Sequence, residues 1–195
     1  ALTALSLNYR TDSIMFNGST SVLKNGLQSY LSIFTGQQPV SNHLKEIFPS
    51  TTAYCTNFSV SNPQKFAANL TGQQNQNGLA DERDQLFSKI KTETAIKIKN
   101  DFDNLLGNEF AVVTTRYFEK FGIVSVNDGS KLKVLLTAMS IMSDENTGQL
   151  SYEKLPLFLL GDAFNIFKRP YFMIIDNYLI FANSSTELAS YYDIY

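Results

Sequence analysis

Two segments in the second half of the chain each have the pattern of a β-hairpin, and they constrain the fold more than any other feature. Residues 109–126 read EFAVVTTRYFEKFGIVSV and residues 170–183 read PYFMIIDNYLIFAN. In each segment, apolar runs typical of strands flank a polar turn, which we expect near Phe118–Glu119 and at Asp176–Asn177. Because a hairpin joins antiparallel strands, the sequence predicts an antiparallel sheet.

Helical patterns alternate with these strands. Predicted strands cover 1–10, 13–17, 51–60 and 148–155; predicted helices cover 22–34, 42–48, 63–72, 81–107, 128–139 and 184–195; residues 156–167 are expected to form a strand, a turn and a short helix. Strands in hairpins joined to helices by short turns predict an α+β fold, with one or more antiparallel sheets of hairpins and helices packed on one face. The order hairpin, helix, hairpin, helix from residue 108 onward resembles part of a ferredoxin-like layout.

The chain has 195 residues, which suits one α+β unit with a single substantial core. Residues 71–78, TGQQNQNG, are the best candidate for a linker because they are polar and contain two glycines. We therefore expect one unit over 1–195, with 1–78 and 79–195 as possible sub-units.

Four strand-to-helix junctions share a cluster of Asn, Ser, Thr or Asp after apolar strand residues: FNGSTSVL, FSVSNPQKF, VSVNDGSKL and FANSSTEL. The first would place a capping hydroxyl at Ser19, Thr20 or Ser21. Such side chains accept hydrogen bonds from the unpaired N–H groups at a helix start. Shared capping chemistry and an old duplication both explain the similarity, and we favour a structural role over a reactive one.

Charge and composition argue against several classes of function. The net charge of −2 disfavours a nucleic-acid partner, which requires a basic surface. Cys55 and His43 are single residues of their types, so no disulfide can form within the chain and a zinc site is not expected. No apolar run approaches the length of a membrane-spanning helix. We predict no metal, no cofactor and no catalytic residue.

Two short patterns suggest chemistry without completing it. The Ser-x-x-Lys spacing of acyl-enzyme hydrolases occurs at Ser88/Lys91 and Ser130/Lys133, but the companion motifs are absent. Ser130 is the better placed of the two serines because it falls in a first helical turn. Asp144 and Asn146 fit the first ligand positions of a calcium loop, yet Leu155 occupies the position of the bidentate carboxylate, so we expect a polar turn.

Three segments together resemble a family of uncharacterised cell-envelope proteins, often predicted lipoproteins, of Bacteroides-type bacteria. The segments are FSVSNPQKF at 58–66, the run at 108–136, and LFLLGDAFNIFKRPYFMIIDNYLIFANSSTEL at 157–188, with Gly161–Asp162 before AFNIF. The resemblance implies a periplasmic or cell-surface location and a longer, multi-unit protein of which this chain is a fragment. A secretion signal would then lie outside the given residues. The family provides no catalytic residues to transfer.

Two functions follow from these observations. The first is a non-enzymatic cell-envelope domain that binds a protein or polymer partner, favoured by 13% aromatic and only 17% charged residues and by the absent catalytic motifs. An exposed patch of Tyr and Phe would support it. The alternative is a serine hydrolase that uses Ser130 and Lys133.

Overall fold

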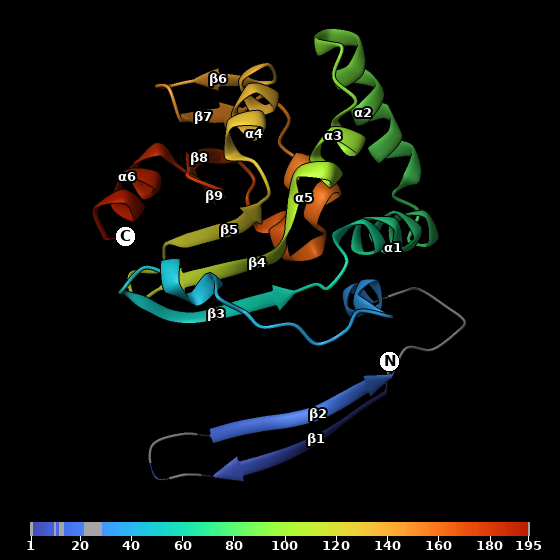
Figure 1. The fold of residues 1–195 in the computed structure, drawn as a ribbon, viewed down its shortest axis with the longest axis vertical. Coiled ribbons are helices and arrows are strands. Elements are labelled where there is room, and N and C mark those ends of the chain that lie inside the picture. The colour runs from blue at the N-terminus through green and yellow to red at the C-terminus, as the bar shows by residue number, and fades with distance from the viewer. Residues whose placement is uncertain (1, 10, 12–13, 22–28, 195) are drawn as a thin grey trace.

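The computed structural model describes residues 2–9, 11, 14–21 and 29–194. Its centre is a seven-stranded sheet with the order β3-β4-β5-β9-β8-β7-β6, in which all neighbours are antiparallel (Figure 1). A second sheet contains β1 and β2 alone. The strands are β1 (Leu2–Tyr9), β2 (Ile14–Ser21), β3 (Thr52–Ser59), β4 (Leu106–Thr115), β5 (Lys120–Val126), β6 (Ser140–Met142), β7 (Thr147–Leu150), β8 (Tyr171–Ile175) and β9 (Tyr178–Ala182). The predicted α+β fold with an antiparallel sheet is confirmed.

Both predicted hairpins form as expected. β4 and β5 turn through Phe118, and β8 and β9 turn through Asp176; both turn residues have a positive φ, of 67° and 49°. The predicted order of hairpin, helix, hairpin and helix is kept, with β6, β7 and α5 inserted between α4 and β8.

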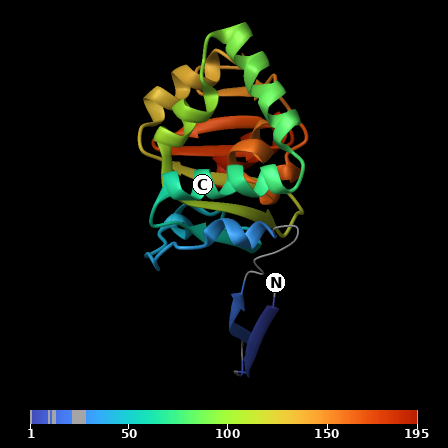
Figure 2. The same cartoon turned by 90° about the vertical axis from the view of Figure 1, so that its right-hand side faces the viewer.

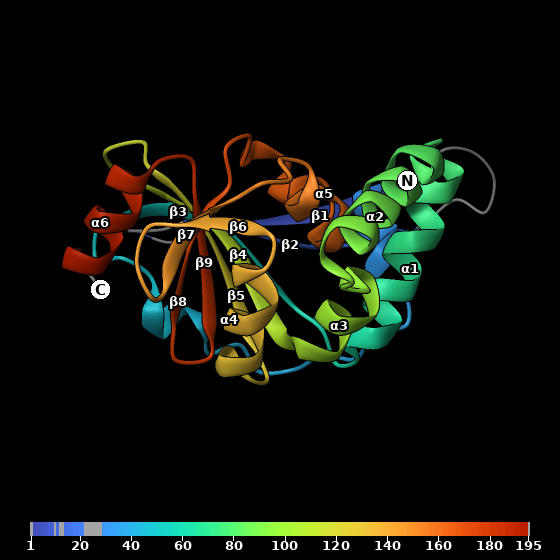
Figure 3. The same ribbon diagram turned by 90° about the horizontal axis from the view of Figure 1, so that it is seen from above.

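Most helices cover one face of the large sheet. On this face lie α1 (Pro63–Gln76), α2 (Ala80–Thr94), α3 (Ile98–Leu105), α4 (Gly129–Thr137), α5 (Leu155–Leu160) and the 3₁₀ helices η1 (Tyr30–Phe34) and η3 (Asp162–Ile166). The other face packs against α6 (Ser185–Ile194) and η2 (Leu44–Ile47). Figure 3 shows α6 and the group α1–α3 on opposite sides of the strands.

Strand pleating divides the buried side chains between the two faces. In β4, Phe110 belongs to the core under the large helical layer, while the next residue, Ala111, belongs to the core under α6 and η2. Phe172 and Met173 of β8 divide in the same way. Successive residues of a strand point to opposite faces, so apolar residues at consecutive positions predict a sheet buried on both sides.

An aromatic cluster joins segments from the two possible sub-units. Phe110 of β4 lies 4.9 Å from Phe66 of α1 and 5.2 Å from Phe58 of β3, measured between ring centroids. Phe34 of η1 stacks on Phe58 at 5.1 Å with an interplanar angle of 5°. The two ranges considered as possible sub-units, 1–78 and 79–195, therefore both contribute to one core.

The predicted linker at 71–78 is wrong, because α1 continues through Gly72 to Gln76. Gln73 and Gln74 are buried, and Gln74 Nε2 donates to the carbonyl of Phe158 at 3.2 Å. Gly72 does not interrupt the helix, which ends at Gln76, two residues before Gly78 adopts a φ of +75°. Polar composition indicated a loop here, although the polar side chains are used in packing.

The single helix predicted over 81–107 is also wrong. It is divided into α2 and α3 at Ala95, whose φ is +63°. Thr94 is responsible in part, since its Oγ1 donates to the carbonyl of Ile90 and accepts from the N–H of Ile96. These local bonds compete with the helical pattern and permit the change of direction. The break buries Ile98 and Phe102 of α3 in the core.

Three further predictions need correction. Residues 22–28 of the predicted helix over 22–34 lie outside the described residues, and the remainder forms only η1. Strand β2 extends past the predicted end at residue 17 and includes Ser19, Thr20 and Ser21, and the helix that they were expected to cap would begin outside the described residues. Residues 156–160 are helical, not extended, because Pro156 occupies the first turn of α5, where its missing N–H costs nothing. The short strand β6 was not predicted.

Candidate functional site

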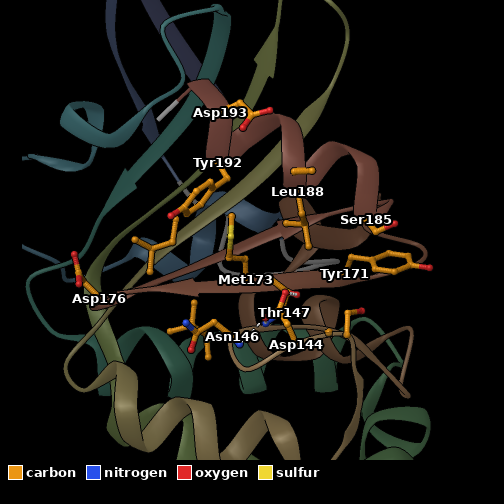
Figure 4. A pocket seen from close by; sticks show the side chains of 15 residues that line it. Asp144, Asn146, Thr147, Tyr171, Met173, Asp176, Ser185, Leu188, Tyr192 and Asp193 are labelled. Carbon is orange, nitrogen blue, oxygen red and sulfur yellow. Dashed lines mark hydrogen bonds between the residues drawn. The ribbon is translucent and has the colours of Figure 1, made fainter.

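A groove of about 670 Å³ runs along β8 on the face that carries α6 (Figure 4). Strand β8 forms its floor, α6 forms one wall, and the turn between β6 and β7 forms the other. Tyr171 lies at one end and Asp176 at the other. Because β8 is five residues long, the floor spans about 16 Å.

The apolar surface of the groove comes from alternate residues of β8 and from one side of α6. Tyr171, Met173 and Ile175 point to this face of the sheet, and Leu188 and Tyr192 descend from α6 with helical i, i+4 spacing. Met173 and Leu188 are almost fully buried, whereas Tyr192 is 68% exposed. Tyr192 is therefore a large aromatic ring held at the groove with most of its surface open to a ligand.

The wall formed by the β6–β7 turn is held rigid by Asp144. Its Oδ1 accepts hydrogen bonds from the N–H groups of Asn146 and Thr147 at 2.8 and 2.9 Å, and its Oδ2 accepts from the hydroxyl of Thr147 at 2.5 Å. The bond from that hydroxyl is the largest cause of a lowered pKa of Asp144. The carboxylate therefore closes the polar turn that the sequence predicted.

The groove is acidic. Asp176 and Asp193 stand at its edges in addition to Asp144 (Figure 4). Of the described residues that line it, none is Lys, Arg or His. The positive charge of Lys133 also lowers the pKa of Asp144, but Lys133 Nζ donates a hydrogen bond to Glu145 Oε1 at 2.5 Å. A ligand in the groove would meet apolar surface beside unneutralised carboxylates, which favours groups with positive charge.

The residues that the sequence singled out for possible chemistry do not converge. Ser130 is exposed in the first turn of α4, and Lys133 points to Glu145. Ser88 is exposed on α2, His43 lies beside Glu46 at 3.5 Å before η2, and Cys55 is exposed on β3. Although Cys55 is exposed as a residue, partial burial raises the pKa of its thiol, so the more reactive thiolate form is disfavoured.

The polar junctions start helices at three of the four predicted places. Asn62 Oδ1 accepts from the N–H of Lys65 at 2.8 Å, Asp128 Oδ1 from Lys131 at 2.9 Å, and Ser184 Oγ from Glu187 at 3.1 Å. Glu187 Oε2 in turn accepts from the N–H of Asn183, one residue before the position expected for a capping box. These caps belong to α1, α4 and α6 and do not share a cleft.

The sequence did not reveal the groove. β8 reads YFMII, which is apolar on both faces, so no alternation marked Tyr171 and Met173 as different from their neighbours. Tyr192 follows the buried Tyr191 in a helix whose orientation could not be known. In the sequence, Asp176 belongs to a predicted hairpin turn and Asp193 to the predicted C-terminal helix, so neither indicated a shared acidic groove.

The described residues include no group of three or more His, Cys, Asp or Glu side chains that could hold a metal ion. In the part of the chain that the structure describes, no helix combines the length and apolar character required to cross a membrane. A scan against protein-family models, a search of curated proteins and a search of solved structures found no match for this chain.

Proposed function

We propose that this chain is a non-enzymatic cell-envelope domain that holds an extended segment of a partner protein in the groove between α6 and the β6–β7 turn. The observation that carries the proposal is the combination of an exposed aromatic ring, an apolar floor and uncompensated carboxylates in one open groove. The envelope location rests on the resemblance of the sequence to predicted lipoproteins of Bacteroides-type bacteria, and not on the geometry.

The chemistry of the groove selects the kind of segment. Its floor accommodates about five extended residues. Apolar side chains would pack on Met173 and Leu188 under the ring of Tyr192, and Lys or Arg side chains would face Asp176 and Asp193. We therefore expect a short segment that mixes apolar and basic residues. A nucleic acid does not fit, because its phosphates would face carboxylates.

The hydrolase that would use Ser130 and Lys133 receives no support from the geometry. Lys133 is bound to Glu145, Ser130 is exposed in the first turn of α4, and the neighbouring carboxylate of Asp128 accepts hydrogen bonds from backbone N–H groups at the start of that helix. Covalent labelling of Ser130 by an acylating serine probe would favour that alternative over our proposal.

The test is a binding measurement by fluorescence anisotropy with short labelled peptides that alternate Leu with Lys, Leu with Glu, or Ser with Lys. We expect binding of the Leu-Lys peptide alone. Because Tyr192 is exposed, Tyr192→Ala leaves the core intact, and we expect it to weaken binding about tenfold, as loss of a central aromatic contact does. Tyr117→Ala is the matched control, since Tyr117 is 62% exposed in the β4–β5 turn.

A second pair of variants tests the charge argument. Asp176→Asn combined with Asp193→Asn keeps the shape of the groove and should abolish the preference for Leu-Lys over Leu-Glu. Equal binding of all three peptides to the wild-type chain, or equal loss in the Tyr192 and Tyr117 variants, would contradict the proposed site.

A further inference from the structure

The β1–β2 hairpin and the edge strand β3 share an unusual composition. Within 2–9, 14–21 and 52–59 there is no Asp, Glu, Lys, Arg or Pro. Proteins commonly protect free sheet edges from pairing with other chains by placing charged residues or proline on them. All three strands are eight residues long and lack this protection.

β3 is the outermost strand of the large sheet next to β4. The N–H of Val60 donates to the carbonyl of Asn108, and the register between the strands is constant from Tyr54 to Ser59. Since paired and unpaired positions alternate in an antiparallel ladder, the backbone groups of Cys55 and Asn57 point away from β4. Residues 53–57 are exposed, so these groups form an open hydrogen-bonding edge.

The hairpin presents an uncovered apolar face. Leu5, Leu7 and Tyr9 alternate along β1 and are 64%, 43% and 74% exposed. Figures 1 and 2 show the hairpin standing away from the large sheet. A hairpin of two strands is marginally stable by itself in water, so it gains stability by joining a larger sheet.

We propose that the β1–β2 hairpin of one copy adds to the β3 edge of a second copy, extending its seven-stranded sheet to nine strands. This pairing satisfies the open backbone groups of β3 and places the hairpin beside a folded sheet. The strands match in length and neither brings a charge into the contact. The second copy is the chosen partner because the hairpin stands away from the large sheet of its own copy (Figure 2).

The contact joins two different surfaces, so each copy can donate one hairpin and accept another. Such heterologous contacts produce chains or rings of subunits. The contact is separate from the groove on the α6 face, and neither proposal depends on the other.

A crosslinking experiment tests the pairing directly. Cys55 is the single cysteine of the chain and lies at the middle of the open edge. A donor chain carries Ser6→Cys and Cys55→Ser, and the acceptor is the wild-type chain, so each copy has one thiol. After mixing equal amounts with a short bismaleimide, we expect donor–acceptor pairs to exceed each kind of like pair by well over the twofold ratio that random encounter gives. A majority of acceptor–acceptor pairs would overturn the proposal, because it would indicate that two β3 edges pair with each other.

Two further measurements complete the test. The average mass in solution should rise above 21.9 kDa with increasing concentration. Cys55→Pro removes an outward N–H without removing a bond to β4 and should abolish the rise, whereas the matched control Cys55→Ser should retain it. A single-chain mass at every concentration would overturn the proposal, and a link within one chain that carries Ser6→Cys and keeps Cys55 would indicate that the hairpin docks on its own copy.

Discussion

Replacing Arg83 by methionine should destabilise the fold by removing a buried connection between α1 and α2. Arg83 is only 6% exposed, and its Nη1 donates to Asn75 Oδ1 at 3.0 Å, to the carbonyl of Thr71 at 3.3 Å and to Gln74 Oε1 at 3.4 Å. Methionine retains most of the apolar stem but donates no hydrogen bond. The change therefore leaves the buried amide oxygen of Gln74, together with the half-buried carbonyl of Thr71 and the exposed Asn75, without this donor.

The magnitude follows from those acceptors. A buried polar group left without its partner costs about 1–3 kcal/mol. Part of this cost is offset because methionine no longer requires a charge to be buried. We expect a loss of about 2 kcal/mol in the free energy of unfolding, measured by chemical denaturation with far-ultraviolet circular dichroism.

Asp84→Asn is the matched control. Asp84 lies 2.8 Å from Arg83 Nη2 but is 64% exposed, so its ion pair is solvated and its removal should cost less than about 0.5 kcal/mol. Equal effects of the two substitutions would refute the reasoning. A neutral effect of Arg83→Met would do so as well, because it would mean that the lost hydrogen bonds contribute no more than burial of the charge costs.

Three other substitutions test separate parts of the structure. Gly129→Ala would place a Cβ 1.9 Å from the carbonyl oxygen of Asp176, so we expect a loss of about 1–3 kcal/mol in thermal or chemical unfolding, against almost none for the exposed neighbour Ser130→Ala. Asp144→Ala should lower the free energy of unfolding by about 1 kcal/mol at neutral pH. Because the folded pKa of Asp144 is lowered, its contribution to stability is present above its ordinary pKa of 3.8 and is lost as pH falls through the folded pKa. A stability difference between wild type and variant that grew on acidification would contradict this. Burial, together with its bond to Glu93, raises the pKa of Tyr152 from 10.0 to about 12, so its contribution to stability is complete below pH 10 and is lost as pH rises toward 12. Phenolate absorbance should therefore show the same number of tyrosines titrating near pH 10 in the wild type and in Tyr152→Phe, and one more in the wild type would contradict the account.

The sequence predicted the elements that local chemistry determines. Turn residues at Phe118 and Asp176 and the caps at Asn62 and Asp128 depend on neighbours within a few positions, and both hairpins and two helix starts formed where expected. Hairpins also make pairing local, so the antiparallel character of the sheet followed from them.

Features that depend on distant partners were missed. Gln74 looked like a linker residue because its partners, Phe158 and Arg83, could not be identified from the local sequence. The helix break at Ala95 needs a left-handed alanine, which the core compensates by burying Phe102. The groove likewise brings β8, α6 and the β6–β7 turn together from separate parts of the chain.

The most direct test of the proposed function is an amide chemical-shift titration of the isotope-labelled chain with the Leu-Lys peptide. We predict that the changes will concentrate at the β6–β7 turn over 143–148, on β8 and its turn over 171–176, and on α6 over 185–193. Absence of any change, or changes centred on α2 or on the exposed face of α4, would contradict the claim that this groove holds a partner segment.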